Sequence, residues 1–354
     1  MAERTKRNLN PQVYFERRAA AHEPQYRFKG KTAAQYSAWK RTLLPKVLAT
    51  LGHAPKKVPP RAELVAEWRE DGLVKQKWLI DVQENLSTPL LLFRPDNLRR
   101  GEKRPAILCC HGHHPAAKHS VMGIATEGQP IDPDRVFGLE MAQAGFVTYA
   151  IDWLGFGDRA YEAKPHFYAG LHGRDRCNIM YNCATLLGTT VLASNLHDAA
   201  SATDFVCGQP HVDEGRLGVM GVSLGGTMTT WVSLYDKRIK AADVICYNGP
   251  FYNIAYSTYN VCGSQITPGL YDLCDIAELQ GLIAPKPLLI EIGIHDTCFK
   301  SDHTIPQFHD TQKIYRAAGA ADNLELDLFG GEHGWGGNKS LPFFRKHLKA
   351  DWPQ

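Results

Sequence analysis

The sequence lacks long apolar runs, and no stretch approaches the roughly 20 apolar residues of a membrane-spanning helix. Its opening segment, MAERTKRNLNPQVYFERR, carries charges but no apolar core, so a secretory signal is not expected. It also lacks an excess of one charge, because 40 Lys and Arg face 37 Asp and Glu in 354 residues. These absences predict a cytoplasmic protein with neither a membrane nor a nucleic-acid partner.

Cysteine is present nine times, which is an odd number, and no two cysteines have C-x-x-C spacing. Neither a zinc site nor a disulfide framework is expected from this spacing. Buried free thiols in a reducing compartment are the better interpretation. The chain also has no internal repeats and no low-complexity linker.

Short apolar runs alternate with helical stretches after residue 73, in a chain with 44% hydrophobic residues. Buried strands that alternate with helices are typical of a mostly parallel sheet covered on both faces, which is the α/β class. A hairpin, KQKWLIDVQ and STPLLLFRPD, precedes the first core strand. The predicted core strands are 106–112, 146–155, 216–223, 241–249, 287–296 and 324–334. The predicted helices are 134–144, 185–207, 224–236, 273–281 and 308–318.

Residues 1–72 are polar and basic, and they carry helix-like patches but no catalytic pattern. We expect a helical extension that packs on a catalytic domain of residues 73–354 and offers a candidate homo-oligomer interface. Apolar residues recur every three to four positions in 32–52, where Pro45 leaves one helix or two open. Residues 250–281 are expected to form a cap or pocket wall.

The sharpest motif is Gly221-Val-Ser223-Leu-Gly225, a G-x-S-x-G pattern between a predicted strand and a predicted helix. Such a tight turn holds its central serine in a strained conformation above the sheet, at a helix N-terminus. Ser223 is therefore the candidate nucleophile.

A serine hydroxyl needs a base beside it and an acid that orients the base. In this chain order, Ser223 should be followed by an acid and then by a histidine, each after a strand. Asp296 follows PLLIEIGIH, and His333 lies in the glycine-rich loop GGEHG. The rival acids are Asp302, Asp310 and Glu332.

The developing oxyanion needs backbone N–H donors. We assign these donors to Leu224, directly after the nucleophile, and to His113 in the loop CHGHH after the first core strand. Histidines 111, 113, 114 and 119 could also suggest a metal site. No carboxylate stands at ligand spacing to them, so neither a metal nor a cofactor is expected.

Several of these motifs together resemble the acetyl xylan esterase and dienelactone-hydrolase-like group of α/β-hydrolases. The matching pieces are HGHHP, DWLGFGDR, VDEGRLGVMGVSLGG, GIHD and GGEHGW, in order over roughly residues 80–340. The resemblance implies an α/β-hydrolase fold with Ser223, Asp296 and His333 as its triad. Dienelactone hydrolases use Cys where this chain has Ser223, which argues against that activity. Secreted polysaccharide deacetylases usually carry an export signal, which argues against polymer substrates.

Aromatic side chains near these motifs are candidate substrate contacts. We select Trp153, Phe251, Tyr252, Tyr256 and Trp335, each with ordinary packing as the equal alternative. In DWLGFGDR, Asp158 and Arg159 are expected to form a structural ion pair or loop anchor. Asp198 is expected to be a helix-surface or loop-tethering carboxylate, not a site residue.

The sequence therefore predicts a cofactor-free serine hydrolase that cleaves small carboxylic esters through an acyl-enzyme, with short acyl groups or acetyl groups as its substrates. A prolyl-oligopeptidase-like peptidase shares the triad order, but the N-terminal residues are too few for a propeller domain. A catalytically silent hydrolase fold that serves as a binding module is the third interpretation.

Overall fold

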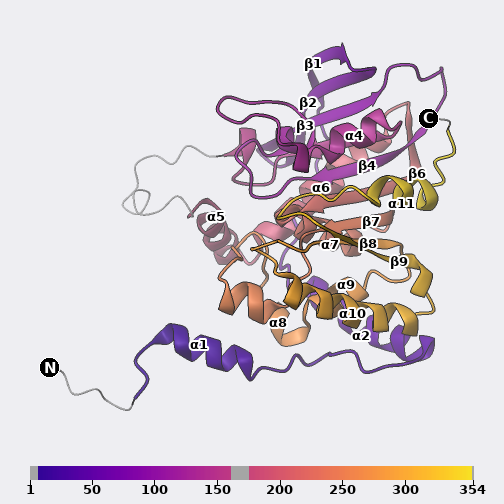
Figure 1. Cartoon of the computed structure of the whole chain (residues 1–354). Helices are drawn as coiled ribbons and strands as arrows, with labels where there is room; N and C mark the ends of the chain where they lie inside the picture. The colour runs from indigo at the N-terminus through magenta and orange to yellow at the C-terminus, as the bar shows by residue number, and fades with distance from the viewer. Residues whose placement is uncertain (1–6, 161–174, 353–354) are drawn as a thin grey trace.

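Nine strands form one sheet in the part of the chain that the computed structural model describes, residues 7–160 and 175–352. The strands lie in the order β1-β2-β3-β5-β4-β6-β7-β8-β9, and neighbours from β5 to β9 pair in parallel (Figure 1). The pairs β1–β2, β2–β3 and β3–β5 are antiparallel. The sheet is thus mostly parallel, as the sequence predicts. The strands are β1 Glu63–Glu70, β2 Leu73–Gln83, β3 Leu86–Pro95, β4 Arg104–Cys110, β5 Val147–Ile151, β6 Val212–Val222, β7 Ile239–Ile245, β8 Leu288–Gly293 and β9 Leu324–Phe329.

Helices connect the strands. The α-helices are α1 Pro11–Ala20, α2 Ala33–Ala49, α3 Lys118–Val121, α4 Phe137–Gln143, α5 Asp175–Leu186, α6 Val191–Cys207, α7 Leu224–Tyr235, α8 Leu270–Leu273, α9 Ile276–Gly281, α10 Ser301–Ala317 and α11 Ser340–His347. Short 3-10 turns are η1 Pro133–Arg135, η2 Gly157–Arg159 and η4 Ala321–Asn323, and η3 Tyr252–Ser257 is a π-helical turn. None of these described helices is long and apolar enough to cross a membrane.

Both faces of the sheet are buried, because successive side chains of its strands enter different hydrophobic clusters. In β3, Leu90 and Leu92 belong to one cluster, whereas Leu91 and Phe93 belong to the other. The first cluster includes side chains of α2, α6, α7, α9 and α10, and the second includes side chains of α3, α4 and α11. This two-layer cover confirms the predicted α/β fold class.

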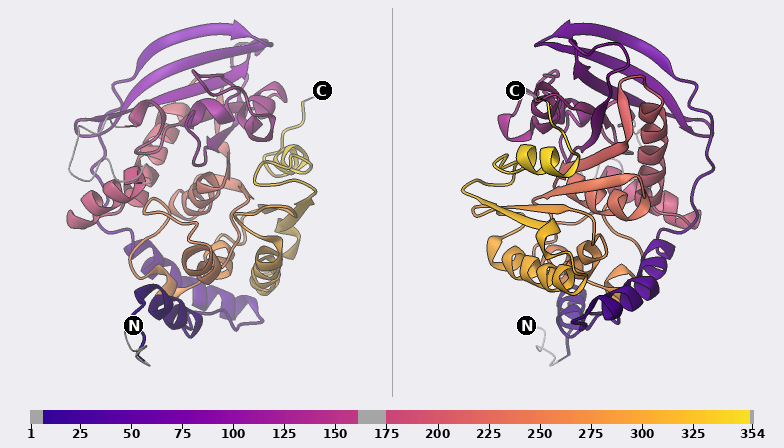
Figure 2. Two further views of the ribbon diagram at one scale, coloured as in Figure 1. Left: turned by 60° about the vertical axis from the view of Figure 1, so that its left-hand side comes forward. Right: turned by 90° about the vertical axis from the view of Figure 1, so that its right-hand side faces the viewer.

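The N-terminal segment differs from the expectation of a wholly helical extension over residues 1–72. Helices α1 and α2 lie at one end of the molecule, whereas β1 and its neighbours β2 and β3 lie at the opposite end (Figure 2). Strand β1 is almost wholly exposed and is held mainly by backbone pairing to β2. A charged, solvent-facing edge strand leaves no periodic apolar signal, so the sequence pattern did not reveal it.

Pro45 lies inside a single helix, α2, so the segment forms one helix and not two. Thr32 caps its N-terminus in a capping box with Gln35, which supplies partners to otherwise free backbone N–H groups. Leu43 and Val47 are completely buried on either side of Pro45. This burial outweighs the lost backbone hydrogen bond of the proline.

Residues 250–281 connect β7 to β8 through η3, α8 and α9. Here η3 packs against α1, α8 against α2, and α9 against α10. The expected wall segment is therefore in contact with the N-terminal helices. All nine cysteines are free thiols, and five of them are buried.

Candidate active site

The turn between β6 and α7 holds Ser223 in a conformation that side chains rarely adopt, with φ of 62° and ψ of −119°. Such a backbone conformation costs about 1–3 kcal/mol, which the surrounding packing must offset. Gly221 permits that packing, because a Cβ atom there would lie 2.6 Å from Cβ of Cys110 on β4. The predicted strand–turn–helix context of the G-x-S-x-G motif is confirmed.

The loop after β4 lies directly against this turn. A Cβ atom at Gly112 would be 2.9 Å from the Val222 carbonyl oxygen and 3.2 Å from Cβ of Ser223. Within residues 7–160 and 175–352, the backbone N–H groups of His113 and Leu224 donate to no protein acceptor. Both N–H groups are thus available beside the serine.

His111 fixes the shape of this loop from the protein interior. Its Nδ1 lies 2.8 Å from the Gly112 carbonyl oxygen, and its Nε2 lies 3.1 Å from the Trp153 backbone nitrogen. A carbonyl can only accept and a backbone N–H can only donate, so Nδ1 carries the proton. Burial lowers the pKa of His111 to about 4, which keeps the ring neutral near pH 7.

Ion pairs anchor the neighbouring DWLGFGDR segment. Lys118 is fully buried, and its Nζ lies 2.7 Å from Asp152 and 3.0 Å from Asp158. Arg159 is 2.9 Å from Asp198 of α6, and both side chains are buried. Asp158 and Arg159 thus anchor the loop through other partners, Lys118 and Asp198, and not by pairing with each other. Asp198 is a buried, loop-tethering carboxylate and does not lie on the helix surface.

The candidate acid and base follow β8 and β9, whose carboxyl ends lie side by side in the parallel sheet. Nδ1 of His333 donates to Oδ2 of Asp296 over 2.8 Å. The other carboxylate oxygen of Asp296 accepts from the backbone N–H groups of Cys298 and Phe299 at 2.7 and 2.9 Å. Phe299 also stacks on the imidazole, with ring centroids 5.7 Å apart. The histidine ring is therefore fixed in both orientation and tautomer.

Electrostatics keep Asp296 ionised. Burial acts to raise its pKa, but the hydrogen bond and charge of His333 and the two backbone N–H groups outweigh burial, so the pKa is lowered. The rival acids lie elsewhere. Asp302 is exposed beside His303, and Asp310 pairs with Lys313. Glu332 directly precedes His333, but the carboxylate that accepts from the His333 Nδ1–H is that of Asp296.

A residue that the motif analysis did not identify, Cys246, links the serine turn to the histidine. It follows β7, directly after Ile245, whose carbonyl accepts from the Ser223 backbone N–H over 3.0 Å. Its thiol donates to the Gly334 carbonyl over 3.3 Å, and its Sγ lies within 4.8 Å of ligand atoms of Asp296 and His333. Burial raises the thiol pKa well above its usual value, so the group stays neutral. The predicted strand 241–249 extends past Cys246, so the sequence did not reveal that this residue lies at the carboxyl end of β7.

The predicted substrate contacts separate into three environments. Trp153 is completely buried, and its indole N–H donates to the His111 carbonyl over 3.1 Å, so it supports the loop from the core and does not face a substrate. The prediction that Trp153 contacts the substrate is therefore corrected. A large aromatic residue near a motif can belong either to the core or to a cleft, and the sequence does not tell which. Trp335 packs on Phe137 and donates to Ser340.

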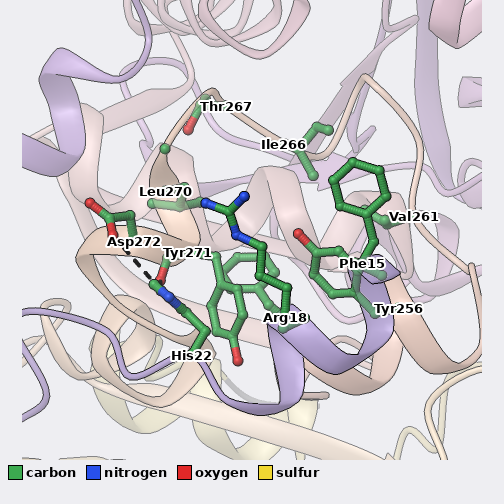
Figure 3. A pocket seen from close by; sticks show the side chains of 14 residues that line it. Phe15, Arg18, His22, Tyr256, Val261, Ile266, Thr267, Leu270, Tyr271 and Asp272 are labelled. Atoms are coloured by element: carbon green, nitrogen blue, oxygen red, sulfur yellow. Dashed lines mark hydrogen bonds and ion pairs between the residues drawn. The ribbon is translucent and has the colours of Figure 1, made fainter. Parts of the chain in front are cut away.

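The other three contacts lie in the wall segment. Tyr252 is a partly buried residue of η3, and Phe251 and Tyr256 line a cavity of about 670 Å³ between α1 and residues 251–272 (Figure 3). Arg18 and Phe15 of α1 form its other side. Its lining includes none of Ser223, Asp296 and His333. This cavity is therefore distinct from the serine turn.

Two groups of side chains among the described residues bring three possible metal-ligand atoms within 4.8 Å of one another. One consists of Cys246, Asp296 and His333, in which Nδ1 of His333 is already committed to Asp296. The other consists of His113, Cys177 and Cys262. Of the four loop histidines that the sequence singled out, only His113 belongs to such a group.

Comparison with known proteins places this geometry in context. YtaP of Bacillus subtilis, provisionally named a hydrolase, is 26% identical over 279 residues, which is 77% of this chain and 86% of that protein. A Bacteroides fragilis structure provisionally named an acetyl xylan esterase superposes with a TM-score of 0.73 at 17% identity, over 93% of this chain and 84% of that one. A glucuronoyl esterase from Solibacter usitatus gives 0.63 at 15% identity, over 90% and 94% of the two chains.

The family profile that matches this chain covers residues 8–246, well over half of its length. The matched region includes β4 and its loop, β6 and the turn at Ser223, whereas Asp296 and His333 lie beyond it. The structural neighbours support the same fold over nearly the whole chain. The chain belongs to the Abhydrolase family.

Proposed function

We propose that this protein is a serine hydrolase that cleaves carboxylic esters and needs no cofactor. The observation that carries the proposal is the hydrogen bond between His333 and Asp296, formed at the same sheet edge as the strained turn of Ser223. A base oriented by a buried carboxylate is what a serine hydroxyl needs to become a nucleophile. Family membership and the esterase-like fold agree with this chemistry.

In the proposed mechanism, Oγ of Ser223 attacks the ester carbonyl carbon while Nε2 of His333 takes the hydroxyl proton. Asp296 stabilises the imidazolium and holds its Nδ1–H. The backbone N–H groups of His113 and Leu224 donate to the oxyanion of the tetrahedral intermediate. Collapse expels the alcohol, which receives the proton from His333. Water activated by the same ring then hydrolyses the acyl-serine.

The acyl group of the substrate is proposed to be short. Residues 250–281 bring polar side chains toward α7, where Gln265 is buried and donates to Thr227 over 3.2 Å. The same segment carries the less buried polar residues Asn253, Ser257 and Asn260, so it offers a long acyl chain little apolar surface to bury, at about 0.8 kcal/mol per methylene. Acetyl esters of small alcohols and sugars are the first substrates to test.

Cytoplasmic location belongs to the same proposal. Nine free thiols, several of them partly or fully exposed, are typical of proteins that work in a reducing compartment. Cell fractionation with an antibody against the protein tests this, and recovery in an oxidising compartment would contradict it.

The test of the catalytic proposal is Ser223→Ala. We expect hydrolysis of p-nitrophenyl acetate by the wild type and a loss of about 10⁴-fold or more in kcat in the variant. A fluorophosphonate probe should label the wild type and leave the variant unlabelled. Ser87→Ala, at an exposed position of β3, is the matched control and should keep full activity. An unlabelled wild type would favour a catalytically silent binding module.

A further inference from the structure

Three metal-ligand side chains from separate segments meet beside the loop after β4. Nε2 of His113 lies 3.2 Å from Sγ of Cys262 and 3.8 Å from Sγ of Cys177. His113 comes from the loop itself, Cys177 from α5, and Cys262 from the segment after η3. All three ligand atoms lie within 4.8 Å of one another. Neither the esterase chemistry nor the fold requires this convergence.

The distances match those that a tetrahedral metal ion imposes on its ligands. With Zn–S near 2.3 Å and Zn–N near 2.05 Å, a tetrahedral angle sets sulfur and nitrogen about 3.6 Å apart. The observed separations of 3.2 and 3.8 Å differ from that value by only a few tenths of an ångström. Two sulfur ligands would stand about 3.8 Å apart by the same geometry, within the observed limit of 4.8 Å. An ion can therefore enter with small side-chain movements.

The two cysteine segments are held together by contacts that involve neither thiol. The backbone N–H of Gly263 donates to Oδ1 of Asn178 over 3.1 Å, which joins the residues that follow Cys262 and Cys177. Gly263 also packs closely on Tyr181, one turn further along α5. Phe156 meets the His113 ring edge-on, with centroids 5.5 Å apart. The ligands are thus preorganised, which lowers the entropy lost when an ion binds.

Access also suits an ion. Cys177 is only 7% exposed, Cys262 is partly buried, and His113 is exposed. The site therefore opens to solvent on the histidine side while its sulfur ligands are shielded.

We propose that His113, Cys177 and Cys262 bind one thiophilic ion of the Zn²⁺ class, with its fourth coordination position open to solvent. Two sulfurs and one imidazole are ligands that Zn²⁺ binds, whereas Mg²⁺ and Ca²⁺ prefer oxygen. The bound ion would connect α5 and the wall segment to the loop whose backbone lies against Ser223. This proposal concerns ion binding and stands independently of the esterase proposal.

The experiment titrates metal-free, phosphine-reduced protein with Zn²⁺ in competition with a chromophoric chelator, and with Co²⁺ as a spectroscopic probe. We expect one equivalent of each ion to bind and the cobalt form to show sulfur-to-cobalt charge-transfer absorption. Cys177→Ser and Cys262→Ser should each weaken Zn²⁺ binding at least 10–100-fold. Loss of a residue that only supports a metal ligand already reduces metal affinity by that range, so loss of a ligand itself should cost no less. Cys183→Ser, an exposed thiol on the same helix α5, is the matched control and should bind like the wild type.

Two further variants keep the outcome decisive. His113→Asn changes an exposed side chain, so it tests the third ligand even where a buried cysteine variant fails to fold. Ser223→Ala should bind Zn²⁺ normally, which separates this proposal from the catalytic one. The proposal is overturned by a wild type without thiolate-to-cobalt absorption, or by Zn²⁺ affinity that is equal in the wild type and the folded ligand variants.

Discussion

Replacing Asp296 by asparagine should disable the base by changing its tautomer. The carboxylate accepts two backbone N–H bonds on one oxygen and the His333 Nδ1–H on the other. In the variant, the amide oxygen must face Cys298 and Phe299, because an amide NH₂ there would oppose two donors. The NH₂ group therefore points at His333 and makes Nδ1 an acceptor, which moves the ring proton to Nε2.

The magnitude follows from this geometry. Turning the amide over would give up two backbone hydrogen bonds of about 1 kcal/mol each and leave buried donors unpaired, so the inactive orientation prevails. With Nε2 protonated, His333 cannot take the serine proton, and kcat should fall by roughly 10⁴-fold, as the same change does in serine proteases.

Steady-state hydrolysis of p-nitrophenyl acetate measures this loss, with circular dichroism to verify folding. The control is Asp302→Asn, which changes an exposed side chain in the first turn of α10. Its kcat should lie within about twofold of the wild-type value, because an exposed substitution leaves the contacts of the site unchanged. A loss at Asp296 below tenfold, or a larger loss at Asp302, would refute the reasoning.

Three further predictions address the oxyanion loop, the acyl pocket and the core. Gly112→Ala should displace the loop from Ser223 and reduce kcat about 10²–10³-fold, whereas Gly330→Ala, in open space, should not; equal kinetics of the two would contradict the close approach. In a p-nitrophenyl ester series from acetate to dodecanoate, kcat/KM should peak between acetyl and butyryl, and a maximum at octanoate or beyond would exclude the short-acyl pocket. Burial, and then the charge of Glu291, raises the pKa of Asp243 well above its usual value. The folded chain therefore keeps a proton that the unfolded chain loses above about pH 4, so wild-type stability should fall as pH rises from there. Asp243→Asn should flatten this slope in urea unfolding at pH 5 and 7.5; an unchanged slope would refute the assignment.

The sequence predicted those parts of the fold and site that depend on local pattern. The parallel strands and their helices follow from alternating apolar runs, since each strand is buried on both faces. Asp296 could be chosen over Asp302, Asp310 and Glu332 because it comes directly after a predicted strand, and the observed hydrogen bond to His333 selects the same carboxylate. The catalytic roles of these residues stay predictions until the variants are measured.

Other features depend on contacts between distant segments, and no local pattern encodes them. Asn178 and Gly263, which directly follow Cys177 and Cys262, are joined by a hydrogen bond although they are 85 positions apart, so sequence spacing gave no hint of a shared site. Trp153 was selected as a pocket residue because it is an aromatic residue that flanks a predicted site loop. Its indole turns inward to the His111 carbonyl, a direction that only the packed structure reveals.

Two histidines of one loop illustrate how burial divides roles between similar residues. His111 is fully buried, its tautomer is fixed by Gly112 and Trp153, and burial keeps its pKa near 4, so the loop keeps its shape across the neutral pH range. His113 faces outward toward two thiols, while its backbone N–H stays free beside the serine turn. One side chain therefore shapes the proposed oxyanion site from within the core. The exposed side chain of His113 is the one proposed to bind an ion. It is not needed to hold the loop in place, because His111 does so from the core.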